Sequence, residues 1–345
     1  MQRVLGHILL ALGVFAVGLG ILLRTWAYPA LAKVPVNIDK TSVAQGSNIT
    51  ALLIDEKDGV PDPKIESGLS LTSTTHVTGD LTAPEVKKDG DVAAWIEASR
   101  VTDDASGIVV TAGVRLVCVN RHTNMAVAPC EHQYLEDETQ GDKVTAPRSA
   151  IQQPGLSFKF PFGTDKSETY KYYDSSIRAT ADAKFDGEDV VKGLAVYRFV
   201  QTIPPTRIGE KEVPGSLIGK SEQVVKADLY YEAKRTLWVE PVSGAIVNGR
   251  EEGKQELRVA GEGPGEGEYV FNGTLQLNDR TVTGNVEEAE KNKSKLWLLT
   301  TLPWILLVAG GVLAVVGVVL LVVSRGTPGK RSLGNPPRQP VGAGT

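Results

Sequence analysis

The chain has 345 residues, of which 41% are hydrophobic and 23% are charged, and its formal net charge is −4. All 41 acidic residues lie between positions 29 and 295, together with 31 of the 37 basic residues, so this middle segment carries a net charge of −10. This acidic balance excludes nucleic acid as an expected partner, because nucleic-acid binding needs basic surfaces that displace counterions.

The first predicted element is an apolar run at residues 4–23, between Arg3 and Arg24. It is long enough to cross a bilayer, since a transmembrane helix needs about 20 mainly apolar residues. A cleaved signal peptide is the alternative, because residues 30–32 (Ala-Leu-Ala) resemble a signal-peptidase site. The run is longer than the roughly 7 to 15 residues of a signal-peptide core, so we expect residues 4–27 to be retained as an anchor.

Residues 28–295 show a pattern of strands and turns rather than amphipathic helices. Apolar residues recur at period two or in short β-branched runs, and Gly, Pro, Asp and Asn clusters separate these runs. The clearest signal is a hairpin at 237–248, whose strands are joined by Pro-Val-Ser-Gly. The other strands are expected at 49–54, 92–99, 108–119, 156–162, 194–203 and 268–277.

These strands predict a mainly β outer domain, an elongated curled sheet or β-barrel, built as one barrel or two lobes. Closure or strong curling of a sheet protects the edges that otherwise invite aggregation. Barrels of sufficient size enclose cavities, so an internal cavity is expected.

Cys118 and Cys130 are the two cysteines of the chain. In an oxidising compartment a bridge between them closes a short loop and contributes about 3 kcal/mol. His122 and His132 lie in the same region, so a Cys/His metal site is the alternative. The spacing fits no common zinc arrangement, and we expect a disulfide, no metal and no cofactor.

A second apolar run covers residues 296–323 and contains no charged residue. Trp297 and Trp304 lie near its beginning, where aromatic rings favour the membrane interface. The preceding stretch, 286–295, is charged and free of proline, which predicts a helical stalk that leads into the membrane.

The basic residues indicate the orientation. The tail, 324–345, carries four basic residues and no acidic one, which is typical of a cytoplasmic segment, although the lysines within 291–295 oppose this orientation. With two spans, residues 1–3 are then also cytoplasmic, and residues 28–295 lie on the periplasmic side of the plasma membrane.

Aromatic residues are dense in the middle of the chain, around 158–173, and recur in the strands that follow. Most such residues fill a β core, and the alternative is that they line a cavity or its rim. The candidates for cavity or rim lining are Phe158, Phe160, Phe162, Tyr170, Tyr172, Tyr197, Phe199 and Trp238.

Signatures of catalysis are weak. Residues 215–221 (Gly-Ser-Leu-Ile-Gly-Lys-Ser) have three residues between their glycines, whereas a phosphate-binding loop has four. Carboxylates within 136–138 and 186–189 could pair as acid and base, but such pairs are expected by chance in a domain with 41 acidic residues, and a solvated acidic surface is the simpler explanation. We therefore expect no enzymatic activity.

Three segments resemble an actinobacterial family of envelope proteins that carries the label porin PorA: residues 160–174, 193–204 and 237–252. The likeness extends to the Arg-flanked first span and to residues 28–33 after it, so it covers nearly the whole chain. The resemblance implies an elongated periplasmic β-barrel with lipid-accessible cavities and a role in lipomannan and lipoarabinomannan assembly. It supplies no catalytic residues.

The leading hypothesis is a membrane-anchored protein that holds or carries a phospholipid or glycolipid precursor, such as a phosphatidylinositol mannoside, with its acyl chains in an apolar tunnel. Burial of each methylene contributes roughly 0.8 kcal/mol. The alternative is a non-catalytic scaffold that docks envelope-biosynthesis proteins. The porin label itself fits poorly, because an outer-membrane pore is built from amphipathic strands without apolar helices.

Overall fold

The computed structural model describes residues 2–57, 60–139, 142–145 and 151–325, so most of the predicted cytoplasmic tail lies outside the described residues. The chain divides into two compact units. One consists of the terminal segments Met1–Tyr28 and Trp297–Thr345, and the other is Pro29–Leu296.

The terminal unit contains two helices that are long and apolar enough to cross a membrane. Helix α1 (Gln2–Leu22) continues through a π-helical turn, Leu23–Ala27, into the short helix α2 (Tyr28–Leu31). Helix α5 (Leu302–Arg325) follows α4 (Asp279–Thr300) after a local irregularity just before Pro303, whose ring nitrogen has no N–H to donate. The two predicted apolar helices and the predicted charged helix before the second are therefore present.

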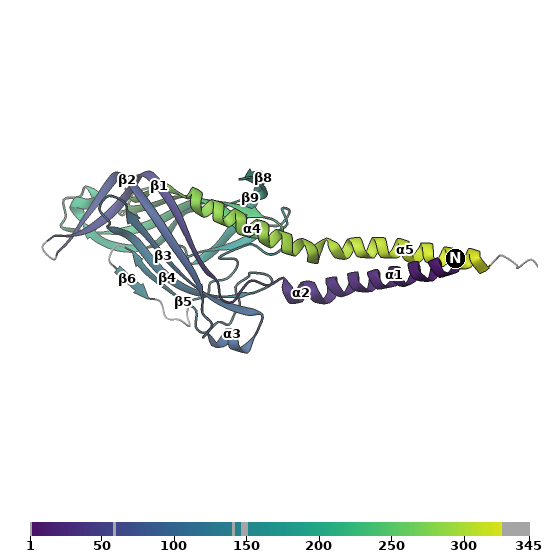
Figure 1. Ribbon diagram of the computed structural model, residues 1–345. Coiled ribbons are helices and arrows are strands. Elements are labelled where there is room, and N and C mark those ends of the chain that lie inside the picture. Colours follow the sequence, from purple (N-terminus) through teal and green to yellow (C-terminus); the bar gives the residue numbers. More distant parts are fainter. Residues whose placement is uncertain (1, 58–59, 140–141, 146–150, 326–345) are drawn as a thin grey trace, which may run out of the picture. The chain divides into compact units, whose positions relative to one another are not determined.

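The large unit is built on one 12-stranded antiparallel sheet that curls into a half-barrel (Figure 1). Its strand order is β6-β5-β4-β3-β2-β1-β12-β11-β10-β9-β8-β7. The chain therefore forms two meanders, β1 to β6 and β7 to β12, which join where β1 pairs with β12. The strands are β1 (Asp39–Lys57), β2 (Val60–Gly79), β3 (Val92–Asp103), β4 (Val109–Asn120), β5 (Tyr134–Thr139), β6 (Asp142–Thr145), β7 (Tyr170–Asp174), β8 (Ala179–Val191), β9 (Leu194–Pro214), β10 (Val224–Glu240), β11 (Ala245–Arg258) and β12 (Glu268–Leu277).

The mainly β prediction is confirmed, and the sheet is the curled form rather than a closed barrel. The predicted hairpin corresponds to β10 and β11, and β12 has the predicted bounds. The predicted strand at 156–162 is wrong, because only Leu156 forms β-bridges there. Segment 215–221 is a connection between β9 and β10 that begins with a single 3₁₀ turn, Gly215–Ile218, and not a phosphate loop that opens a helix.

Side chains of a strand alternate between the two faces of the sheet. We call inner the face that carries Trp95, Val117, Phe199 and Leu237, because residues 151–164 pack against it. Helix α4 packs on the opposite, outer face, where Val282 and Val286 contact Val247 and Trp238. The short helix α3 (Pro84–Lys88) also packs on the outer face, beside Leu116 and Cys118.

Candidate functional site

Residues 151–164, which we call the crossing segment, run from the β4 side of the half-barrel to the β10–β11 hairpin. The Gln153 side-chain amide donates hydrogen bonds to the backbone oxygens of Leu116 (3.0 Å) and Tyr134 (3.3 Å). Further along, the Phe160 N–H donates to the Gly244 carbonyl at 2.9 Å. The segment is therefore tied to both halves of the sheet.

Single β-bridges add to this closure. Leu156 bridges Tyr172 of β7 and Met125, and the adjacent Ala126 bridges Val119 of β4. The two halves of the sheet, open to each other between their edge strands β6 and β7, are thus linked at one end through the crossing segment.

The β10–β11 turn is shaped to receive the crossing segment. Gly244 has a φ of 73°, which favours glycine, and a Cβ there would lie 2.2 Å from the Phe160 oxygen. The Thr164 N–H donates to the Pro241 oxygen at 2.7 Å. A side chain at position 244 would therefore separate the crossing segment from the turn.

Most of the predicted aromatic candidates pack on one another. The Phe160 ring centre lies 4.8 Å from that of Phe199 and 5.0 Å from that of Tyr170, and the Tyr172 ring stacks at 6.0 Å. Tyr197 contacts Phe185 at 5.6 Å. These residues fill the core at the crossed end of the half-barrel.

The three other candidates lie elsewhere. Trp238 is on the outer face, where its indole N–H donates to Asp189 at 3.0 Å. Phe158 packs edge-on against Trp95 at 5.3 Å, and Phe162 belongs to the same inner-face cluster. Phe158 and Phe162 stay partly exposed, as Tyr170 and Tyr197 do, so a ligand on the inner face could reach them.

The inner face also carries charged groups that the sequence analysis did not single out. Arg115 of β4 pairs with Glu97 of β3 at 2.8 Å, and its guanidinium lies 5.2 Å from the Phe158 ring centre. Burial opposes the charge of Arg115, but the field and hydrogen bonds of Glu97 raise its pKa above the ordinary value. The guanidinium therefore stays charged inside the half-barrel.

A second ion-paired group surrounds Arg235 of β10. Arg235 donates to Asp174 of β7 at 3.0 Å, to Glu251 of β11 at 2.7 Å and to the Gln201 oxygen of β9 at 2.9 Å. Asp174 is almost fully buried, with 1% of its side chain exposed. This group ties the edge strand β7 to the middle of the sheet, and it makes the inner face amphipathic rather than wholly apolar.

Lys159 is a third cation in this region, on the crossing segment. Its Nζ lies 3.8 Å from the Phe162 ring centre, and its side chain is only partly exposed. Burial lowers the pKa of Lys159 from 10.5 to about 7, against the raising effect of Glu240 and Glu288. Sequence reasoning missed Lys159, although an isolated lysine between Phe158 and Phe160 was a visible signal.

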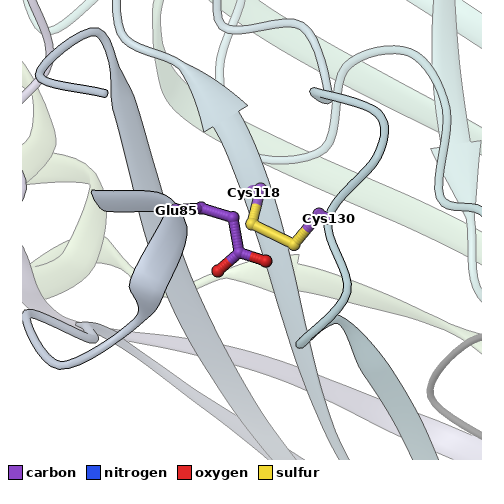
Figure 2. Close-up of side chains that lie close together, drawn as sticks. All are labelled: Glu85, Cys118 and Cys130. Atoms are coloured by element: carbon purple, nitrogen blue, oxygen red, sulfur yellow. A yellow bond between two sulfur atoms is a disulfide. The ribbon is translucent and has the colours of Figure 1, made fainter. Parts of the chain in front are cut away.

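The predicted disulfide between Cys118 and Cys130 is present, with 6.0 Å between the two Cα atoms. Glu85 of α3 lies beside the disulfide (Figure 2). One oxygen of its carboxylate and the two sulfur atoms are within 4.8 Å of one another. Because the sulfurs are bonded to each other, neither offers a thiolate to a metal.

The histidines of the alternative metal site are not brought to the sulfurs as a set. His132 Nδ1 lies 3.1 Å from Glu85, whereas His122 lies beside Asp91, with 3.3 Å between Nε2 and the carboxylate. Burial opposes the charge of Glu85, but hydrogen bonds from the Glu131 N–H and from His132 hold its pKa below the ordinary value. The carboxylate of Glu85 thus links α3 to the residues that follow Cys130.

The paired acids weighed as catalytic candidates are mostly bound to cations on the surface. Asp186 and Asp189 both pair with Arg198, and Glu188 pairs with Lys166. The side chains of Asp137 and Glu138 lie outside the described residues. These contacts agree with the solvated-surface alternative.

A hollow of about 340 Å³ lies near the β3–β4 turn. Its lining combines Leu53, Leu69 and Ile108 with four carboxylates and one lysine, and none of the eight aromatic candidates belongs to it. The hollow differs in chemistry from the apolar tunnel that the sequence analysis expects, because acidic groups dominate its polar lining.

Comparisons with known proteins give one consistent family. The model of the family described as Porin PorA matches residues 5–319. A protein described as Porin PorA from Corynebacterium amycolatum is 25% identical over 375 residues, which covers 90% of this chain and 96% of its own. Another of that description, from Corynebacterium resistens, is 25% identical over 262 residues, which covers 57% of this chain and 63% of its own.

Among solved structures, a DUF1329 family protein from Desulfovibrio piger is 12% identical, with a TM-score of 0.19. That alignment covers 78% of this chain and 89% of the other.

Proposed function

Since the chain belongs to the porin PorA family, we propose that it is a non-enzymatic, membrane-anchored envelope protein that binds lipid on the inner face of its half-barrel. The sheet unit joins the apolar helical segments directly, at Tyr28–Pro29 and at Leu296–Trp297. These connections tether the sheet unit to the membrane from which a lipid would be taken. A role in lipoglycan assembly, with a phosphatidylinositol mannoside or related lipid as ligand, is the finer form of this proposal.

The observation that carries the proposal is the mixed chemistry of the inner face. Apolar clusters around Phe199 and Ile203 alternate along it with the charged groups of Arg115 and Arg235. An amphiphile has both an acyl chain and a polar head, so this face can complement both parts. Each methylene that leaves water contributes roughly 0.8 kcal/mol.

A pore through the sheet, which the name of the relatives suggests, has less support. The outer face of the described strands carries ion pairs, such as Lys171 with Asp182 and Arg198 with Asp186. A transmembrane barrel instead presents an apolar band to the lipid.

Photolabelling of the full chain tests the proposal. The protein in mild detergent receives a phospholipid with a photoactivatable acyl chain, and digestion followed by mass spectrometry locates the label. We expect labelled peptides from the crossing segment and from the inner face around Phe158 and Phe162. Peptides from α3, which packs on the outer face, serve as the internal control.

Label confined to α1 and α5, together with the absence of co-purified lipid in native mass spectra, would contradict lipid binding by the sheet. If crosslinking in cells then gave a stable protein partner for the lipid-free domain, the scaffold alternative would replace the proposal.

A further inference from the structure

Lys159 is the starting point, because its charge is enclosed without being paired. Its neighbours along the chain are aromatic: Phe158 contacts Trp95, and Phe160 is fully buried. The Nζ atom lies over the Phe162 ring at 3.8 Å. A cation over a ring face gains some stabilisation, but the gain is smaller than the cost of withdrawing an ammonium group from water.

Within the described residues, no carboxylate lies at ion-pair distance from Lys159. The two acids that act on it from farther away, Glu240 and Glu288, are already engaged. The Glu240 carboxylate is fully buried and accepts hydrogen bonds from the backbone N–H groups of Val242 and Ser243 and from the Ser243 hydroxyl. Glu288 pairs with Lys40 at 2.6 Å.

The side chain of Lys159 is nevertheless partly exposed, so a solute can reach it. An incoming anion would restore the favourable interaction that the ammonium group loses on burial. Its charge would also raise the depressed pKa of Lys159 and keep the amine protonated at neutral pH.

We infer that Lys159 is the anion contact of the lipid site, where its ammonium group binds the phosphate of a lipid headgroup beside Phe158 and Phe162. This inference rests on the proposed lipid binding and assigns the polar end of the ligand to the crossed end of the half-barrel. Phe158 and Phe162 then flank the first part of the lipid. A Lys–phosphate hydrogen bond is charge-assisted and is therefore stronger than a neutral one.

A competition experiment on the full chain tests the inference. The purified, delipidated protein in uncharged detergent micelles receives equal amounts of dioleoylphosphatidylglycerol and dioleoylglycerol, which share acyl chains but differ in the phosphate. Native mass spectrometry measures the ratio in which the two bind. We expect the wild type to prefer the phospholipid, Lys159→Met to lower this preference about tenfold, and Lys159→Arg to keep most of it.

Lys234→Met is the matched control, because Lys234 is exposed on the outer face of β10. It should leave the preference unchanged. A Lys159→Met protein with the wild-type preference would overturn the inference while leaving lipid binding intact. A wild type that binds neither lipid would overturn the proposed function and the inference with it, and displacement of the phospholipid by inorganic phosphate would assign Lys159 to free phosphate instead.

Discussion

Gly13 of α1 and Gly310 of α5 lie backbone against backbone. A Cβ on Gly13 would be 2.6 Å from the Gly310 oxygen, and a Cβ on Gly310 would be 2.8 Å from the Gly13 oxygen. Gly6 and Gly20 are buried on the same helix as Gly13, one heptad to either side. Small residues at this spacing let apolar helices approach closely along one seam, which is how helices associate within a bilayer.

Gly13→Leu should therefore separate α1 from α5, because the side chain would overlap the facing backbone at a cost of about 1–3 kcal/mol. Val14 and Val312 are 60% and 59% exposed, so cysteines introduced there can carry spin labels. Double electron–electron resonance in nanodiscs then measures the distance between the two labels. The native cysteines are joined in a disulfide and stay unlabelled. We expect a broader and longer distance distribution in the variant.

Gly18→Leu is the control for the helix seam, because a Cβ at Gly18 meets no atom within 4 Å. Its distance distribution should match that of the parent protein. If mass measurement showed that the mature chain begins at Lys33, the chain would lack α1, and the prediction that α1 is retained and packs against α5 would be wrong.

Arg235→Leu should destabilise the sheet unit by about 3–5 kcal/mol, because it leaves the buried Asp174 carboxylate without its cation. Thermal unfolding followed by the β signal in circular dichroism measures the loss. Arg198→Leu removes an arginine that is 31% exposed, and its cost should stay below about 1 kcal/mol. If the double variant Arg235→Leu, Asp174→Asn recovered none of the loss, the pair with Asp174 would not be its cause.

The sequence predicts the positions of the strands better than it predicts the contacts of their charged residues. Alternation in β10 places Tyr231, Ala233, Leu237 and Val239 on one face, and Arg235 occupies the same register. An inward arginine was therefore visible in the pattern. Its partners were not, because Asp174 lies 61 positions away in the chain and meets Arg235 only when the sheet curls.

The failure at residues 156–162 has a related cause. Leu156, Phe158, Phe160 and Phe162 alternate as in a strand, but the alternation arises because the segment packs against the inner-face clusters of both halves of the sheet. Only its first residue pairs with a strand, since the Leu156 N–H donates to the Lys171 carbonyl of β7, whereas the Phe160 N–H donates to Gly244 in the β10–β11 turn. Conversely, β2 was not predicted, since its Thr- and Ser-rich sequence is almost entirely exposed or half-exposed and carries little apolar signal.

Removal of the disulfide by Cys118→Ala, Cys130→Ala should lower the free energy of unfolding by about 3 kcal/mol, because the unfolded chain regains the freedom of a short closed loop. Comparison of thermal unfolding with and without a reductant measures the effect, and the double variant should be insensitive to the reductant. If the wild type were equally insensitive while a thiol assay showed full reduction, the bridge would not stabilise the corner around Glu85.

The depressed pKa of Lys159 should make the ligand-free protein more stable as the pH rises. In the folded state Lys159 releases its proton at a pKa of about 7, whereas the unfolded chain holds that proton up to the ordinary value of 10.5. Between these values the unfolded state binds more protons, so the free energy of unfolding increases with pH, and below this window the full cost of the buried charge remains. Among the described residues, Glu240 and Glu288 are the acids that act on Lys159, Lys40 pairs with Glu288, and all three are unchanged in the variants. Thermal unfolding of the delipidated full chain between about pH 7 and about pH 9 should therefore show that the unfolding temperature rises with pH in the wild type and in Lys234→Met but not in Lys159→Met.

The Lys159→Met variant should also be the most stable of the three near neutral pH, because it buries no charge at position 159. Parallel pH profiles for all three proteins would show that Lys159 is fully solvated, and the enclosure on which its anion-binding role depends would then be wrong.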